Sequence, residues 1–361
     1  MTIEFIGMIQ PREQSEIHPA QGPAIDLGYL RASAQAHEAG GFDRFLIGWY
    51  SNGPDGLQLA AYAAGHTTRV GFLVAHRPGF QAPTNAARSF ATLDQLSEGR
   101  AAIHVISDGD DADQRRDGDT LGKDERYART DEYVGILKSI WAATGPVDHE
   151  GPYYRFAGAS SEVRTYRQPR IPIYFGGASD AAIEVAGKHA DVYALWGETP
   201  QQAAEIIARV RASARRHRGN AAAQGIRFSL SFRPILAATE AEAWARADRI
   251  LADIKRVRGE AALGPATGAP ASVGSQRLLQ AAVQGERHGS LYTAIAAATG
   301  ARGNTTALVG TPLQVAEAFL EYQALGVTTF LIRGFDPLDD AIDYGRELLP
   351  ITRRLVAERP A

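Results

Sequence analysis

Short apolar segments alternate with amphipathic ones along the chain, and this alternation constrains the fold more than any other feature. The segments expected to form strands are residues 3–9, 42–49, 70–75, 101–106, 171–175, 190–196, 226–236 and 328–332. The expected helices cover residues 26–39, 57–65, 83–96, 124–143, 181–189, 200–217, 240–257, 275–283, 312–325 and 339–355. Strands that are joined through helices form parallel sheets. A count near eight, without a Gly-x-Gly-x-x-Gly motif after the first strand, predicts a closed α/β TIM (β/α)8 barrel rather than a doubly wound open sheet.

Two stretches interrupt the alternation. Residues 147–156 are expected to form a small hairpin or excursion before the fifth strand. Residues 258–303 are rich in Gly, Ala, Ser and Thr, and a segment of this length within a compact domain is typical of a lid or a disordered loop. We therefore predict a single domain over residues 1–361, with a mobile lid at about residues 258–303.

The composition excludes several classes of protein. The formal net charge of −3 disfavours a nucleic-acid-binding protein, which needs a basic face. The chain has no cysteine, which excludes disulfides, thiolate metal sites and cysteine nucleophiles. The N-terminus lacks a basic and apolar leader, and no stretch approaches the ~20 apolar residues of a membrane span. We expect a cytoplasmic protein that binds neither nucleic acid nor a membrane.

An acidic run at residues 108–119 has the composition of a possible metal site. Its spacing matches no ligand signature. We therefore predict a solvated acidic loop there, and no metal.

The fifth expected strand ends at two glycines, Gly176 and Gly177, before Ser179 and Asp180 begin a helix. Glycines let the backbone approach a ligand closely, and a helix start offers unpaired N–H groups and a positive dipole end. The pattern is typical of a phosphate-binding turn. It also fits an ordinary strand-to-helix turn with Ser179 as the N-cap.

Several motifs, in order along the chain, resemble one family. They begin with Arg77-Pro78, Pro83-Thr84-Asn85 and the run from Ala91 to Arg100, and continue through Glu125-Arg126-Tyr127, Tyr174 to Asp180, Trp196-Gly197-Glu198, Thr306 to Gly310 and Gly345-x-Glu347-Leu348-Leu349-Pro350. The chain resembles the bacterial-luciferase-like flavin monooxygenases, and among them most closely the alkanesulfonate monooxygenases.

This resemblance implies a TIM barrel that binds reduced FMN supplied by a separate NAD(P)H-dependent flavin reductase. The FMN phosphate is expected on the turn formed by Gly176, Gly177, Ala178 and Ser179, with a hydroxyl from Tyr127. The flavin ring is expected near Ala75 and Ser107. For His104 we expect the role of a packed histidine inside the barrel.

The resemblance also implies that reduced FMN and O2 oxygenate a small anionic organosulfur compound, releasing sulfite and an aldehyde. Burying a sulfonate requires arginines or equivalent donors. Arg302, after the expected lid, matches the active-site arginine of the family. Where the family carries an Arg-x-His pair, this chain has Ser231 and Arg233, so the positive charge has moved by two residues and the histidine is absent. Arg333 ends the last strand. Salt bridges of Arg233 and Arg333 to carboxylates such as Asp108 or Asp336 are the alternative.

The remaining expected site residues surround the substrate. Trp196 is retained from the family pattern, and His76 is the candidate base, or else a histidine that only packs beneath the flavin. Gln10 stands where a histidine is common, and Phe335 where the family carries tyrosine. Gln10, Trp49, Arg333 and Phe335 are therefore the expected substrate-binding residues.

Two alternative functions stay open from the sequence. A deazaflavin-dependent oxidoreductase uses the same barrel and would consume no oxygen. A flavin-binding protein without catalysis would bind FMN and turn nothing over. By resemblance we also expect a homodimer or homotetramer.

Overall fold

The computed structural model describes residues 2–107, 111–259, 272–284, 287–301, 303 and 305–359. Its first half contains β1 (Glu4–Ile9), α1 (Leu27–Ala39), β2 (Arg44–Ile47), α2 (Gly56–Ala64), β3 (Gly71–His76), α3 (Pro83–Leu96), β4 (Ala101–Val105), α4 (Asp111–Arg116), α5 (Lys123–Ala142), β5 (Val147–Glu150), β6 (Arg155–Ala159), β7 (Ile173–Gly176) and α6 (Asp180–His189).

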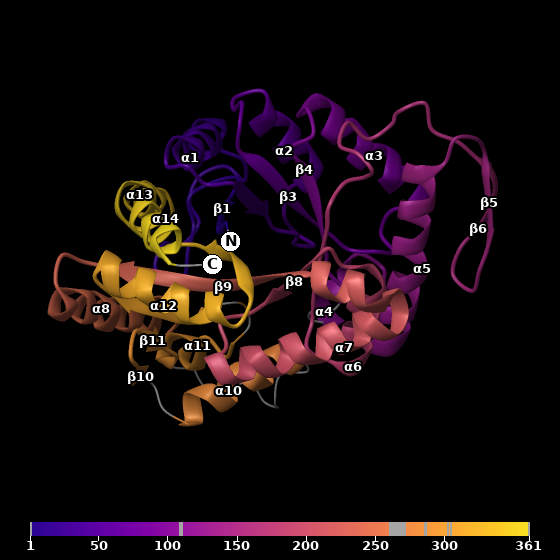
Figure 1. Cartoon of the computed structure of the whole chain (residues 1–361). Coiled ribbons are helices and arrows are strands. Elements are labelled where there is room, and N and C mark those ends of the chain that lie inside the picture. Colours follow the sequence, from indigo (N-terminus) through magenta and orange to yellow (C-terminus); the bar gives the residue numbers. More distant parts are fainter. Residues whose placement is uncertain are drawn as a thin grey trace. The chain divides into compact units, whose positions relative to one another are not determined.

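The second half contains β8 (Val192–Leu195), α7 (Pro200–Gly225), β9 (Arg227–Leu236), α8 (Glu240–Arg258), α10 (Val273–Gln284), β10 (Arg287–His288), β11 (Leu291–Tyr292), α11 (Ala294–Ala298), β12 (Ala307–Gly310), α12 (Pro312–Ala324), β13 (Val327–Ile332), α13 (Pro337–Asp343), the π-helix η1 (Tyr344–Leu348) and α14 (Leu349–Glu358). Most of these elements are labelled in Figure 1.

The strands form the predicted TIM barrel. The sheet order is β10-β11-β12-β9-β13-β1-β2-β3-β4-β7-β8, and β8 pairs again with β9. The closed ring therefore consists of β1, β2, β3, β4, β7, β8, β9 and β13, which are the segments expected from the sequence, so the predicted fold class is confirmed.

The chain divides into two compact units, each named here after a strand that it contains. The β9 unit comprises residues 1–45, 194–208 and 227–361, and the β3 unit comprises residues 46–193 and 209–226.

The β9 unit is built on its longest strand. The first half of β9 pairs in parallel with β13, which in turn pairs with β1, whereas its second half pairs with β12. Phe5, Phe232, Phe319 and Phe330 are buried and contact one another in the core of this unit. Thr239 caps α8 through a reciprocal pair of contacts with Glu242, which satisfies N–H groups of the first turn.

The β3 unit is built on β3, β4 and β7, which are parallel and in register, with His76 beside Val105 and Val105 beside Phe175. The long helix α5 packs against α3 and α6, and Trp141 on α5 donates a hydrogen bond of 2.9 Å to the carbonyl of Ala87 on α3. Figure 1 shows the β5–β6 hairpin alongside α5. This hairpin confirms the excursion predicted at residues 147–156. Because of this shared register, the C-terminal ends of β3, β4 and β7 lie side by side.

Three predictions of local structure were wrong. Residues 258–303 were expected to lack strands, but β10 and β11 lie within them and pair with each other. β12 was not predicted at all. These strands are two to four residues long, too short for an alternating pattern to show. Within the expected acidic loop, residues 111–116 form α4.

Candidate functional site

One face of α5 contacts the ends of three strands in the β3 unit. At the end of β3, His76 Nε2 lies 2.7 Å from the hydroxyl of Tyr133. Just after β4, the Ser107 hydroxyl donates to Thr130 Oγ1 at 2.8 Å. After β7, the hydroxyl of Tyr127 lies beside Gly177. The helical spacing of Tyr127, Thr130 and Tyr133 puts them on one face. The structure thus brings together four of the predicted residues: His76, Ser107, Tyr127 and Gly177.

The turn after β7 has no room for a side chain at Gly177. Its φ is +134°, and a Cβ there would lie 2.8 Å from Ala182 Cβ and 2.9 Å from the hydroxyl of Tyr127. Ser179 caps α6 by accepting from the Ala182 N–H at 3.3 Å. Behind the turn, the buried Tyr193 donates its hydroxyl to the Gly177 carbonyl.

These features fit the phosphate of a flavin nucleotide. Glycine lets the backbone approach an anion, the start of α6 offers N–H groups and the positive end of the helix dipole, and the phenol of Tyr127 supplies a neutral donor. Ser179 also caps α6, as expected for an ordinary strand-to-helix turn. The same residue can do both, because a hydroxyl has two acceptor positions and one donor.

His76 is buried among aromatic rings. Trp49 and Phe90 approach its imidazole edge-on, and burial lowers the pKa of His76 to about 4. It is therefore neutral near pH 7. A general base works best with a pKa near the working pH, so this environment favours the packing role for His76. Ala75, its neighbour on β3, is also buried. His104 is likewise neutral, because burial lowers its pKa to about 4.

Two predicted substrate-binding residues carry buried polar atoms without a partner among the described residues. In the β9 unit, the side-chain oxygen of Gln10 accepts no hydrogen bond, although the residue is only 7% exposed. In the β3 unit, the indole N–H of Trp49 has no acceptor, and its ring stacks on Phe80 at 6.1 Å between centroids. Buried polar groups are normally paired, so each of these atoms is available to a bound molecule.

Arg233 and Arg333 in the β9 unit share one carboxylate, that of Glu16. Arg233 contacts both Glu16 oxygens, at 3.1 and 2.9 Å, and Arg333 contacts them at 3.4 and 3.3 Å. Burial alone would raise the pKa of Glu16, but the two guanidinium groups hold it well below its ordinary value. The cluster of two cations and one anion therefore has a net charge of about +1.

Arg233 is 2% exposed and uses most of its donors within the protein. Besides its contacts to Glu16, it donates to the carbonyls of Arg333, at 2.7 Å, and Gly334, at 2.8 Å. Its guanidinium also lies 3.8 Å from the ring centroid of Phe335. Phe335 is fully buried in an apolar cluster that includes Ile235. Both Arg233 and Phe335 thus stand in the packed interior of the β9 unit.

The salt-bridge alternative for the two arginines holds, but their partner is Glu16 rather than Asp336. Asp336 accepts from Arg246 at 2.8 Å and pairs with His18 at 2.6 Å, not with Arg233 or Arg333. Asp108 lies outside the described residues. Glu16 is the actual partner, and the loop after β1 that carries it gave no sequence signal.

Trp196 follows β8 and contacts the segment predicted to be a lid. A Cβ on Gly274 of α10 would lie 3.3 Å from the Trp196 ring. Nearby, Arg277 of α10 pairs with Glu198 at 2.7 Å, and Ser275 donates to the carbonyl of Ala301 at 2.7 Å. Residues 260–271, 285–286 and 304 of this region, and Arg302, lie outside the described residues.

The described part of the acidic run after β4 is exposed at Asp111 and Asp117, as predicted for a solvated loop, but Asp113 and Asp119 are ion-paired and largely shielded from solvent. Asp113 accepts from Arg77 at 2.6 Å and also from the Ser51 hydroxyl. Asp119 pairs with Arg129, and only 2% of the Asp119 side chain is exposed. Asp111 pairs with Arg126 at 2.7 Å.

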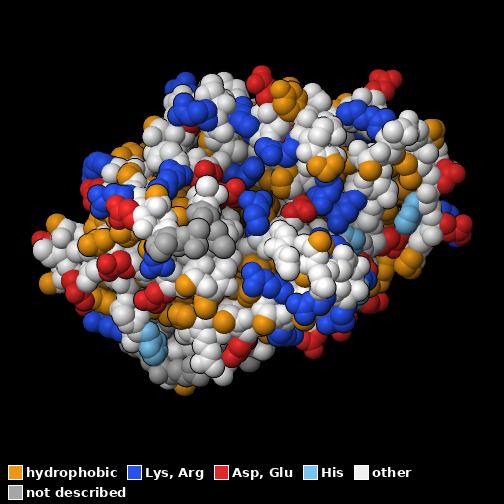
Figure 2. Space-filling model, in the orientation of Figure 1, with side chains coloured by type: hydrophobic (Ala, Val, Ile, Leu, Met, Phe, Trp, Pro, Cys, Tyr) orange, Lys and Arg blue, Asp and Glu red, His pale blue; other side chains and the backbone are white. Residues whose placement is uncertain are grey.

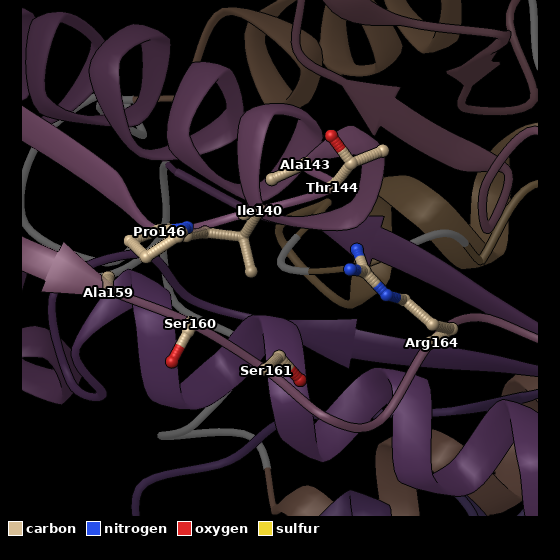
Figure 3. Close-up of a pocket in the computed structure, with 9 residues that line it drawn as sticks. Ile140, Ala143, Thr144, Pro146, Ala159, Ser160, Ser161 and Arg164 are labelled. Atoms are coloured by element: carbon tan, nitrogen blue, oxygen red, sulfur yellow. The ribbon is translucent and has the colours of Figure 1, made fainter.

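A small pocket of about 150 Å³ lies elsewhere in the β3 unit (Figure 3). It is lined by Ile140, Ala143, Thr144, Gly145, Pro146, Ala159, Ser160, Ser161 and Arg164. Ile140 and Ala143 place it at the far end of α5 from Tyr127, about 20 Å along the helix at 1.5 Å per residue. The pocket is therefore separate from the site at the strand ends.

The described residues contain no group of three or more His, Cys, Asp and Glu side chains placed to hold a metal. No helix among them is both long and apolar enough to span a membrane. On the face shown in Figure 2, basic and acidic side chains are both present.

The chain matches one protein family and several solved structures. The family model described as luciferase-like monooxygenase matches residues 3–329. A riboflavin lyase, solved with modified FMN and riboflavin, aligns with a TM-score of 0.80 and 22% identity over 99% of this chain and 92% of that one. EDTA monooxygenase from Chelativorans sp. BNC1 aligns with a TM-score of 0.77 and 19% identity over 100% and 95% of the two chains.

A third structure belongs to a protein with a different cofactor. The coenzyme F420-dependent tetrahydromethanopterin reductase from Methanopyrus kandleri aligns with a TM-score of 0.70 and 18% identity, over 97% of this chain and 99% of that chain. At these identities the likeness to solved structures is one of fold.

Proposed function

The chain belongs to the luciferase-like monooxygenase family, and from this premise we propose that it is a two-component monooxygenase that uses reduced FMN. The proposed substrate is a small anionic organosulfur compound, most simply a sulfonate, and the proposed partner is an NAD(P)H-dependent flavin reductase. Bound reduced FMN supplies the electrons with which O2 is activated. One oxygen atom enters the carbonyl product, the other leaves as water, and the sulfur leaves as sulfite.

The observation that carries this proposal is the turn at Gly177. Backbone N–H groups of the turn and of the start of α6 would bind the phosphate, with the hydroxyls of Tyr127 and Ser179 as further donors. Such donors replace water around a dianion at fixed positions. Ala75 and Ser107 of the same unit are the residues that would contact the flavin ring.

For the substrate, we propose that Arg333 and Gln10 of the β9 unit act together with Arg302, which the resemblance assigns to the site. Arg333 contacts Glu16 at longer distances than Arg233 does. Moving the Arg333 guanidinium from Glu16 to a substrate anion would therefore cost less interaction energy than moving that of Arg233. Arg233 holds Glu16 in place. Trp196, also in the β9 unit, supplies apolar surface that excludes water from the substrate.

The test is an anaerobic titration with reduced FMN, followed by addition of O2 and a panel of alkane-, hydroxyalkane-, sugar- and aryl-sulfonates. We expect saturable binding of reduced FMN and release of sulfite from at least one compound, with oxygen consumed in step. Oxygen-independent hydride transfer with a deazaflavin would contradict the proposal and support that alternative. Tight FMN binding without turnover on any compound would instead indicate a flavin-binding protein without catalysis.

A further inference from the structure

The carbonyl of Gly177 accepts a hydrogen bond from Tyr193, a residue that the sequence analysis did not single out. Tyr193 lies on β8, next to β7 in the sheet, and is 1% exposed. Its hydroxyl donates to the Gly177 carbonyl oxygen. Tyr127 stands at a different side of the same glycine, with its hydroxyl beside the position of the missing side chain. Two phenols therefore contact one glycine.

The geometry of the peptide bond gives this hydrogen bond a consequence. In a planar trans peptide, the C=O of one residue and the N–H of the next point in opposite directions. Because the Gly177 carbonyl points to the buried Tyr193, the N–H of Ala178 must point away from it. If this N–H binds the phosphate of the proposed cofactor, the phosphate lies on the side of the peptide opposite Tyr193.

Glycine makes such an anchor necessary. A residue without a Cβ populates many backbone conformations, so the peptide between Gly177 and Ala178 can rotate unless something fixes it. A buried hydroxyl that donates to the carbonyl fixes its orientation before any ligand arrives. Preorganised donors bind an anion more tightly because no reorganisation is required.

We infer that Tyr193 is a positioning residue for the cofactor phosphate, acting through the Gly177–Ala178 peptide without touching the cofactor. This inference rests on the proposed function, which assigns a flavin phosphate to the turn. A purely structural role for Tyr193 is the competing explanation, because a buried tyrosine hydroxyl needs a partner wherever it lies. The two roles differ in whether the hydroxyl affects the phosphate specifically.

The experiment compares Tyr193→Phe with wild type in two anaerobic titrations, one with reduced FMN and one with reduced riboflavin, which lacks the phosphate. We expect the dissociation constant for FMN to rise about fivefold in the variant, the usual effect of one hydrogen bond, and that for riboflavin to stay unchanged. The ³¹P resonance of bound FMN should also shift. Equal weakening of both flavins, or no change in either, would overturn the inference.

Tyr344→Phe is the matched control. Tyr344 is buried and donates to a backbone carbonyl, that of Pro234, at 2.5 Å, but it lies in the β9 unit. The Tyr344→Phe variant should keep the wild-type ratio of the affinities for reduced FMN and reduced riboflavin. A wild-type protein that binds riboflavin as tightly as FMN would refute the proposed phosphate site and the inference together. A wild-type preference for FMN that survives in Tyr193→Phe would refute the inference alone.

Discussion

The β3 unit and the β9 unit carry two different kinds of candidate anion site. In the β3 unit the turn at Gly177 is built from backbone groups, and the neighbouring Tyr127 and Ser179 are neutral. In the β9 unit the candidate site is built around Arg333, which shares the carboxylate of Glu16 with the buried Arg233. The first site is a fixed arrangement of dipoles, whereas the second is a set of charges with an internal counter-ion.

The difference follows from the physics of the two kinds of donor. Backbone N–H groups at a helix start cannot satisfy one another, so they remain available to a ligand. A buried guanidinium without a partner is costly, so the chain provides one. We therefore expect the two units to respond differently to substitution: loss of folding stability in the β9 unit, and loss of cofactor affinity in the β3 unit.

The largest expected effect is that of Glu16→Gln. This change leaves the buried Arg233 without its counter-charge, and breaking a buried pair from one side costs on the order of 3 kcal/mol of unfolding free energy. Denaturant unfolding measures it. Glu184→Gln is the control, because Glu184 pairs with Arg216 at an exposed position and such pairs contribute less than about 1 kcal/mol. A smaller loss for Glu16→Gln than for the control would contradict our view of the β9 unit.

The ion pair of Glu16 and Arg233 also predicts how the folding stability depends on pH. The folded pKa of Glu16 lies well below its unfolded value, so the unfolded chain takes up the proton first as the pH falls. The contribution of Glu16 to stability is therefore fully present above about pH 4.3 and is lost progressively below it. In Glu16→Gln, this component of the acid destabilisation should be missing.

The next largest effect should come from Gly177→Ala. The added methyl group would lie within 3 Å of Ala182 Cβ and the Tyr127 hydroxyl, at a positive φ, so the turn must move. We expect reduced FMN to bind roughly 100-fold more weakly, equivalent to about 2.7 kcal/mol. The control is Gly219→Ala, which also has a positive φ but no atom within 4 Å of the added Cβ. If both variants bound FMN as wild type does, the phosphate would have to bind elsewhere.

The smallest effect concerns His76. Since burial lowers its pKa to about 4, the pH profile of activity should show no limb from this residue between about pH 5 and 8. An NMR titration of the imidazole measures the pKa directly. Between about pH 6.5 and 4 the unfolded chain binds a proton that the folded chain does not, so His76 makes stability fall as the pH falls there. A measured pKa near 7 would restore His76 as a candidate base.

The predictions that rest on the periodicity of apolar residues were confirmed for the barrel strands. The periodicity of apolar residues located all eight barrel strands, and the break of α7 at Gly219, where φ is +83°, agrees with the helix end expected near His217. The short strands β10, β11 and β12 were missed because each is only two to four residues long, too short for an alternating pattern to show. The ion pairs of the acidic run were missed because charge alone does not reveal that Arg77, Arg126 and Arg129 approach it.

The sequence by itself determined the barrel and the glycine turn after the fifth strand, because periodicity and the need for a missing side chain are properties of neighbouring residues. Only the tertiary structure decided which charges meet. Arg233 and Glu16 are 217 residues apart, and Tyr193 reaches Gly177 from the next strand of the sheet. A long side chain finds its partner wherever the ends of the strands bring one within reach, and no local pattern records that distance.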